Sequence, residues 1–228
     1  MIKYAKLPFH LNIADLQAAT KNLLSVYAGK PHLNTSQYTG HWDVIALRSP
    51  GGSIDNVAPD LMGAAGFADT ALMMQMPAAQ QFVSGLFCDI MAVRLLNLRV
   101  GAKIMPHRDF DLCFEHGEAR LHIPIFTNPQ VEFFIEEERI TMNPGECWYI
   151  NANLTHNVVN AGETDRVHLV IDCKVNDWLK NIFEQGEITT MQQLQNPDET
   201  KKIIAELRRM NTEVANKLAD DLLKTIQE

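Results

Sequence analysis

The feature that most constrains the fold is a series of short strand-like segments between residues 90 and 173. They alternate apolar and polar side chains or are rich in β-branched and aromatic residues, and they cover residues 91–99, 119–126, 131–135, 139–142, 147–150 and 167–171. Turn-forming stretches separate them at 127–129, 136–138 and 143–145. Short strands at regular spacing with turns between them indicate an antiparallel sandwich or barrel. The sequence therefore predicts a mainly β protein with a double-stranded β-helix core, the jelly-roll or cupin-like fold.

Helical patterns flank this core. Residues 11–28 carry apolar side chains at helical spacing, and 77–87 begin with a proline in the first turn. Between them, Trp42–Leu47 is strand-like by composition and Ser49–Ser53 is a loop. We expect one jelly-roll domain over residues 1–178, with its core at about 40–173, and a helical extension over 179–228.

The extension carries an apolar stripe at helical spacing after Asn196. Its members are Ile203, Ile204, Leu207, Met210, Val214, Leu218 and Leu222. An isolated helix would leave this stripe in water. We therefore expect it to pack on the N-terminal helices or to form a homodimer.

Charge and composition exclude several classes of partner. The 20 basic and 28 acidic residues give a net charge of −8, which argues against a general binder of nucleic acid or of anionic membranes. The cysteines, Cys88, Cys113, Cys147 and Cys173, show no Cys-x-x-Cys spacing, and the first residues contain no apolar signal core. No stretch approaches the roughly 20 apolar residues of a membrane span. The sequence predicts a cytoplasmic protein with reduced thiols.

A His-x-Asp motif, His107 and Asp109, ends a short apolar run. Residues two apart on an extended backbone project to the same side, so both side chains can reach one ion. His156 lies downstream, past several strand-like segments. Two histidines and one carboxylate with open positions are the ligands of non-haem Fe(II) oxygenases. The alternative is that these are three unrelated polar residues in turns.

Arg166 stands ten residues after His156 and begins an alternating strand, so it shares a face with His168. A guanidinium there offers a two-donor fork to the far carboxylate of a co-substrate, and His168 would support it from behind. The alternative places Arg166 on the surface, paired with Asp165 or Glu163.

Three further residues are candidates for binding carboxylates. Arg120 and His122 share one strand face, which is either exposed at a sheet edge or turned inward toward co-substrate or substrate. Arg94 lies within an apolar strand, where a charge requires a partner, and it is a candidate for a substrate anion. Trp42 is a further candidate for substrate contact.

Glycine and asparagine spacing sharpens the jelly-roll prediction. The run Gly145, Asn151, Asn153, His156, Asn160 resembles the second signature of double-stranded β-helix proteins, which has proline at the position of Asn151 and glycine at that of Asn153. Asparagine tolerates the left-handed backbone conformation that such a turn needs.

These motifs together resemble the aspartyl/asparaginyl β-hydroxylase family of Fe(II)/2-oxoglutarate dioxygenases. The similar stretches are 93–109, 120–124, 144–148, 156–160 and 166–169, within residues 40–173. The resemblance implies that His107, Asp109 and His156 bind Fe(II). It also implies that Arg166 holds the distal carboxylate of 2-oxoglutarate, and that Arg120 and His122 line the co-substrate and substrate carboxylates.

The family's animal membrane enzymes have glycine where this chain has Asp109. The chain is more similar to the small bacterial members, among them free amino-acid hydroxylases such as proline cis-4-hydroxylase. The resemblance implies a hydroxylase that uses Fe(II), 2-oxoglutarate and O₂ on a small amino-acid-like substrate and releases succinate and CO₂. Two alternatives remain open: a peptidyl Asp/Asn β-hydroxylase, and a non-catalytic cupin that binds a ligand or senses a metal.

Overall fold

A computed structural model of the 228-residue chain describes residues 1–9, 11–57, 66–109, 112–191 and 197–225. Its contacts divide the chain into two compact units, Met1–Thr190 and Met191–Glu228. Among the described residues, no helix is long and apolar enough to cross a membrane.

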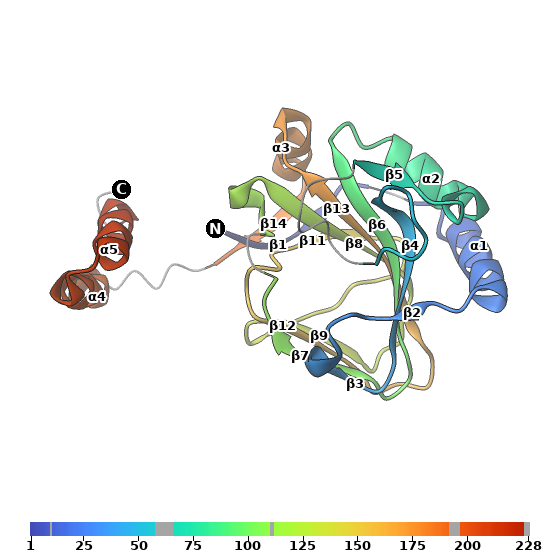
Figure 1. Cartoon of the computed structure of the whole chain (residues 1–228), viewed down its shortest axis with the longest axis horizontal. Helices are drawn as coiled ribbons and strands as arrows, with labels where there is room; N and C mark the ends of the chain where they lie inside the picture. The colour runs from blue at the N-terminus through green and yellow to red at the C-terminus, as the bar shows by residue number, and fades with distance from the viewer. Residues whose placement is uncertain (10, 58–65, 110–111, 192–196, 226–228) are drawn as a thin grey trace. The chain divides into compact units, whose positions relative to one another are not determined.

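The first unit is built from two antiparallel sheets, as the alternating segments predicted (Figure 1). The larger sheet has the order β14 (Glu187–Thr190), β1 (Ile2–Leu7), β11 (Cys147–Ile150), β8 (Glu118–Phe126), β13 (Arg166–Lys174), β6 (Ile90–Leu98), β4 (Trp42–Pro50) and β2 (Lys30–Pro31), and β5 (Phe67–Asp69) pairs with β4. The smaller sheet has the order β10 (Glu138–Ile140), β9 (Val131–Ile135), β12 (His156–Asn160), β7 (Lys103–His107) and β3 (Tyr38–Thr39). The predicted jelly-roll class is confirmed.

Helices cover the outer face of the larger sheet. They are α1 (Ile13–Val26), α2 (Pro77–Ser84) and α3 (Asp177–Glu184), with short 3₁₀ turns η1 (Thr35–Gln37), η2 (Met73–Gln75) and η3 (Phe114–His116) between strands (Figure 1). The helices predicted at 11–28 and 77–87 are confirmed with shorter ends. Leu16 of α1, Ala79 of α2 and Phe183 of α3 are buried in one cluster with side chains of the sheet.

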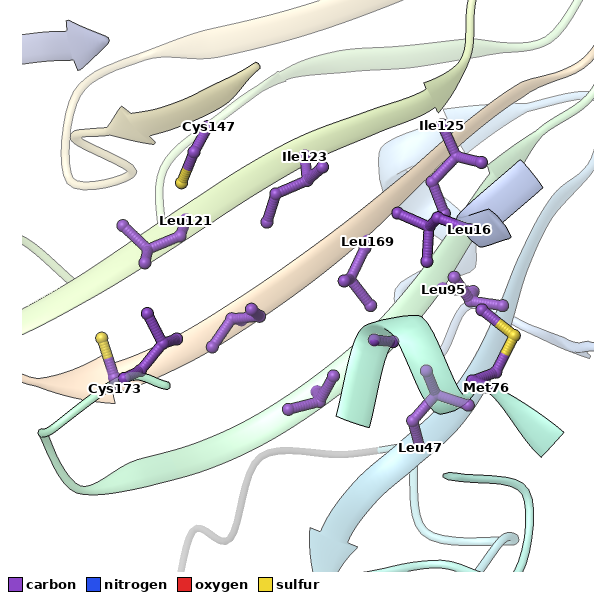
Figure 2. Packing of buried hydrophobic residues seen from close by; sticks show 14 of the residues in the cluster. Leu16, Leu47, Met76, Leu95, Leu121, Ile123, Ile125, Cys147, Leu169 and Cys173 are labelled. Carbon is purple, nitrogen blue, oxygen red and sulfur yellow. The ribbon is translucent and has the colours of Figure 1, made fainter. Parts of the chain in front are cut away.

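The two-residue period of the central strands separates the core from the cavity. Leu121, Ile123 and Ile125 of β8 and Leu169 of β13 point toward the helices and are fully buried (Figure 2). Successive side chains of a strand point to opposite faces. Their neighbours therefore turn toward the space between the sheets; these are Arg94, Arg120, His122, Arg166 and Asp172. The alternative of an exposed edge for Arg120 and His122 is wrong, because β8 lies between β11 and β13.

The boundary between the two units differs from the predicted one. The structure places it at residue 190 rather than 178, for two physical reasons. Leu179 and Phe183 of α3 are buried in the main core. In addition, β14 pairs with β1 along the edge of the larger sheet. Helix α3 and strand β14 therefore belong to the first unit.

Local backbone details also differ from expectation. Ser49 and Pro50, predicted in a loop, end β4, where they pair with Ala68 and Phe67. Among the described residues, a positive φ outside glycine occurs at Glu136 and Asn211. The left-handed conformation expected around Asn153 is therefore absent; instead, the Asn153 backbone N–H donates to the side chain of Asn151 at 3.1 Å.

The second unit contains α4 (Pro197–Met210) and α5 (Glu213–Thr225). The predicted stripe is not continuous, because Asn211 adopts a φ of 47° and ends α4. Ile204, Ala215 and Ala219 are buried; among the stripe residues left exposed are Ile203, Met210, Val214 and Leu218. The homodimer through these helices stays a prediction.

Candidate metal centre and co-substrate pocket

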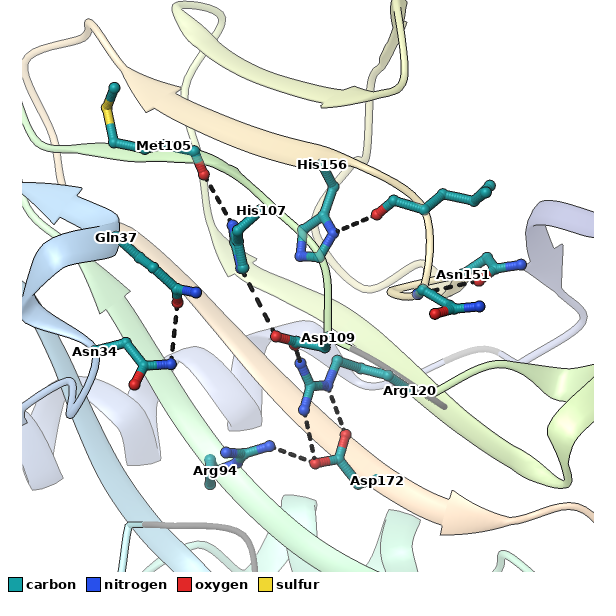
Figure 3. A network of polar contacts seen from close by, with 12 residues as sticks. Asn34, Gln37, Arg94, Met105, His107, Asp109, Arg120, Asn151, His156 and Asp172 are labelled. Carbon is teal, nitrogen blue, oxygen red and sulfur yellow. Dashed lines mark hydrogen bonds and ion pairs between the residues drawn. The ribbon is translucent and has the colours of Figure 1, made fainter. Parts of the chain in front are cut away.

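The pairing of β7 with β12 brings the two predicted histidine ligands together. His156 lies directly opposite His107 in the register, and their ring centroids are 4.2 Å apart. Asp109 follows two residues after His107, and its backbone N–H donates to the carbonyl of Ala152 at 2.8 Å. One ligand atom from each of the three side chains lies within 4.8 Å of the others (Figure 3).

Backbone carbonyls fix the tautomer of both histidines. The Nδ1 atom of His107 lies 2.8 Å from the carbonyl of Met105, and that of His156 lies 3.0 Å from the carbonyl of Leu154. A carbonyl only accepts hydrogen bonds, so each Nδ1 carries the proton. The lone pair of each imidazole is then on Nε2, which is free to bind a metal ion. Hydrogen bonds of this kind orient metal-binding histidines in known sites.

Electrostatics keeps His156 and Asp109 in the protonation states that a metal needs. Burial, and then the neighbouring His107, lower the pKa of His156 to about 4, so its ring is neutral at neutral pH. Burial would raise the pKa of Asp109, but Arg120 and the two histidines lower it below its usual value. Two imidazoles and one carboxylate fit Fe(II) with positions left open.

Arg166 lies on the inner face of β13. It is 1% exposed, its guanidinium lies over the ring of Phe133 at 5.8 Å, and it donates to Nδ1 of His168 at 2.9 Å. Within the described ranges, no carboxylate pairs with Arg166. Asp165, the predicted surface partner, instead binds Arg99 at 2.9 Å. Burial lowers the pKa of Arg166 to about 9, so it remains charged at neutral pH.

One nitrogen of this guanidinium and one ring nitrogen of His122 have no hydrogen-bond partner among the described residues. In the described part of the chain, Nε of Arg166 and Nδ1 of His122 are buried without a hydrogen bond. Both residues line a cavity of about 1270 Å³ that also reaches His107, Asp109 and His156. Buried polar atoms are nearly always hydrogen-bonded, so orphaned groups of this kind indicate a missing ligand. An anionic co-substrate fits them.

His168 lies beside Arg166 and acts as a neutral hydrogen-bond acceptor. A guanidinium has no acceptor atom, so Nδ1 of His168 must accept the bond from Arg166 and the ring proton lies on Nε2. Burial and then the charge of Arg166 lower the pKa of His168 well below its usual value. The structure thus places His168 behind Arg166, where the sequence predicted it.

A second group of charges lies on the same face. Asp172 is directly opposite Arg120 in the pairing of β13 with β8, and it accepts from Nε of Arg120 at 2.7 Å. Arg94 of β6 also donates to Asp172, and the far end of Arg120 donates to Asp109 (Figure 3). The sequence analysis predicted that Arg120 binds a carboxylate of co-substrate or substrate. In the structure, it contacts two carboxylates of the protein itself.

Asp172 was not among the predicted site residues. The signal was present, because Asp172 directly follows the apolar run Leu169–Ile171 and shares a face with Arg166 and His168. A buried carboxylate needs cationic partners, which is the argument that singled out Arg94.

His32 was also missed. Its ring stacks on Trp42 with centroids 3.6 Å apart and planes 11° apart, and both residues line the cavity. Burial, and then Arg94, lower the pKa of His32 to about 4. His32 reaches the cavity because its backbone N–H donates to the carbonyl of Trp42 at 2.8 Å, next to the short β2–β4 pairing. No local motif marks it.

Comparison with known proteins places this geometry in context. L-proline cis-4-hydroxylase of Rhizobium meliloti (strain 1021) is 28% identical over 151 residues, covering 65% of this chain and 53% of the relative. L-proline cis-3-hydroxylase 2 of a Streptomyces species is 30% identical over 138 residues, covering 58% of this chain and 47% of the relative. The chain thus spans about half the length of these relatives.

Among solved structures, the non-haem α-ketoglutarate-dependent epimerase SnoN from nogalamycin biosynthesis is similar with a TM-score of 0.48 and 14% identity, over 75% of this chain and 77% of that one. The family model described as aspartyl/asparaginyl β-hydroxylase matches residues 13–175, which include both sheets' central strands and every predicted ligand. Because this match covers well over half of the chain, the protein belongs to the aspartyl/asparaginyl β-hydroxylase family.

Proposed function

We propose that the protein is an Fe(II)- and 2-oxoglutarate-dependent dioxygenase that hydroxylates an unactivated C–H bond of an amino acid or an amino-acid-derived substrate. Succinate and CO₂ are the co-products. The observation that carries the proposal is a pair of neighbouring sites in one cavity. One is the group His107, Asp109 and His156, and the other is the buried Arg166, which has no carboxylate partner among the described residues.

Bound Fe(II), with 2-oxoglutarate and O₂, would supply the oxidising chemistry of the reaction. The protein's part is to bind, orient and exclude water. His107 and His156 would bind the ion through Nε2, because Nδ1 of each ring faces a backbone carbonyl, and Asp109 contributes a negative charge. Arg166 would bind the distal carboxylate of 2-oxoglutarate, and His122 would line the same part of the cavity.

Arg94, His32 and Trp42 are the candidates for contacting the substrate. Arg94 lines the cavity and its Nε has no hydrogen-bond partner among the described residues. A guanidinium in that position favours a substrate with a carboxylate. The stacked rings of His32 and Trp42 offer a flat, partly apolar surface beside it. The names of the two relatives, both proline hydroxylases, support an amino-acid substrate.

The size of the cavity favours one alternative within this class. About 1270 Å³ exceeds the range of roughly 300–1,000 Å³ that is usual for small-molecule sites. An amino acid within a peptide or attached to a carrier would use this space, so a peptidyl Asp/Asn β-hydroxylase is the second candidate. A non-catalytic cupin does not require a buried arginine in the same cavity as the metal ligands. Arg166 therefore counts against the non-catalytic alternative.

The test is a panel of free amino acids and short Asp- or Asn-containing peptides, incubated with the protein, Fe(II), 2-oxoglutarate and ascorbate. We expect at least one member to gain the mass of one oxygen atom in step with succinate formation. The His156→Ala variant serves as the control and should give neither product. If no member gains oxygen and wild type also fails to turn over 2-oxoglutarate without substrate, the non-catalytic alternative replaces the proposal.

A further inference from the structure

The buried charges around Asp172 form a chain that ends at the proposed iron ligand. We propose that Asp172 and Arg120 are positioning residues that hold Asp109 so that one of its carboxylate oxygens faces the metal. This inference rests on the proposed iron site and gives Arg120 a role in addition to binding a carboxylate of co-substrate or substrate.

Three of the five N–H donors of Arg120 bind protein carboxylates. Its Nε donates to one oxygen of Asp172 at 2.7 Å, and one terminal nitrogen donates to the other oxygen at 3.1 Å. The second terminal nitrogen donates to Asp109. Burial alone would lower the pKa of Arg120, but the charges of Asp172 and Asp109 raise it above its usual value. Arg120 is thus a permanent cation whose fork faces Asp172.

The two oxygens of Asp109 have different neighbours. Oδ2 accepts from Arg120, whereas Oδ1 lies 3.9 Å from Nε2 of His107, on the side of the three-residue metal group. A carboxylate can bind a metal through one oxygen or through both. Because Arg120 turns Oδ2 toward itself, Oδ1 is the oxygen that Asp109 presents to the ion. Binding through one oxygen keeps open the coordination position that a second oxygen would fill.

Asp172 fixes Arg120 in this pose because the sheet register fixes Asp172. The two residues lie directly opposite each other on β8 and β13, and Arg94 approaches Asp172 from the other neighbouring strand, β6. Burial would raise the pKa of Asp172, but Arg120 and Arg94 lower it to about 2, so it is ionised at any working pH. Without this charge, two buried guanidiniums would share the single carboxylate of Asp109 and repel each other.

Cobalt binding tests the proposal on the intact chain without requiring turnover. Co(II) is titrated into wild type, Asp172→Asn and Arg120→Lys while its visible d–d absorption, which reports the ligands and geometry of the ion, is recorded. We expect each variant to bind Co(II) about ten- to a hundredfold more weakly, which is the usual effect of removing a group that orients a metal ligand. We also expect the absorption spectrum of the bound ion to change.

Two comparisons separate positioning from a general charge effect. Asp89→Asn removes the same charge from the lining of the same cavity, and Asp89 has no side-chain contact with Arg120 among those described; it should keep wild-type affinity and spectrum. Arg120→Lys keeps the charge but cannot span both carboxylates. It also carries the test if Asp172→Asn fails to fold, as judged by circular dichroism.

The outcomes distinguish this inference from the function on which it rests. If wild type binds Co(II) and both variants bind it with unchanged affinity and spectrum, the positioning role is wrong and the iron site stands. If wild type binds no Co(II), or binds it no more tightly than His156→Ala does, the proposed metal site is wrong. The positioning role is then wrong as well.

Discussion

The Arg166→Lys variant is expected to bind 2-oxoglutarate markedly more weakly than wild type, and Arg166→Ala more weakly still, by on the order of a hundredfold or more. Charge-assisted hydrogen bonds are worth about 1.5–3 kcal/mol each, and a guanidinium supplies two parallel ones to a carboxylate. Lysine keeps the charge but loses the fork. In the structure, Arg166 is buried and its Nε has no partner among the described residues.

Titration of 2-oxoglutarate into each variant, with bound metal measured in parallel, checks this expectation. The metal content should stay at the wild-type level, because Arg166 contacts none of His107, Asp109 and His156 in the described contacts. Arg139→Lys is a matched control, since Arg139 is about half exposed on β10 and pairs with Glu132. Wild-type 2-oxoglutarate affinity in Arg166→Ala would mean that this arginine is structural.

His107→Ala and His156→Ala are each expected to abolish Fe(II)-dependent succinate formation while the fold survives. Each change removes one of the two nitrogen ligands, and the two remaining side chains do not complete the set that holds Fe(II). Folding should tolerate the loss, because both histidines line the cavity and belong to the smaller sheet rather than to the cluster under the helices. Succinate assays and thermal unfolding are the measurements.

His41→Ala is the matched control for these variants, because His41 is exposed and does not line the cavity. It should keep wild-type turnover. If both ligand variants also keep wild-type turnover, the iron binds elsewhere in the protein.

Strand periodicity explains how much of the site was predictable from sequence. Arg120 and His122 on β8, and Arg166 and His168 on β13, occur at alternating positions, so their common face follows from local pattern alone. The same alternation puts Ile123 and Ile125 on the opposite face of β8, where the structure buries them fully. Local periodicity thus predicted which side chains share a face, without predicting whether that face points inward or what each side chain contacts.

Local sequence pattern could not predict the contacts between strands that are distant in sequence. The pairing of Asp172 with Arg120 depends on the register between β13 and β8, and a shift by one residue would turn each side chain to the other face. His32 reaches the cavity only through the short pairing of β2 with β4. The boundary at residue 190 depends likewise on β14 pairing with β1, at the other end of the chain. Register and long-range pairing are properties of the folded sheet.

The most direct test of the central claim is an anaerobic titration of 2-oxoglutarate into the Fe(II)-loaded protein, followed by visible absorption. Chelation of 2-oxoglutarate to a protein-bound Fe(II) ion produces a charge-transfer band that neither component shows alone. We expect this band to saturate at one equivalent in wild type and to be lost in His156→Ala. A wild-type protein that gives no band, or a His156→Ala variant that gives the wild-type band, would contradict an iron site built from His107, Asp109 and His156.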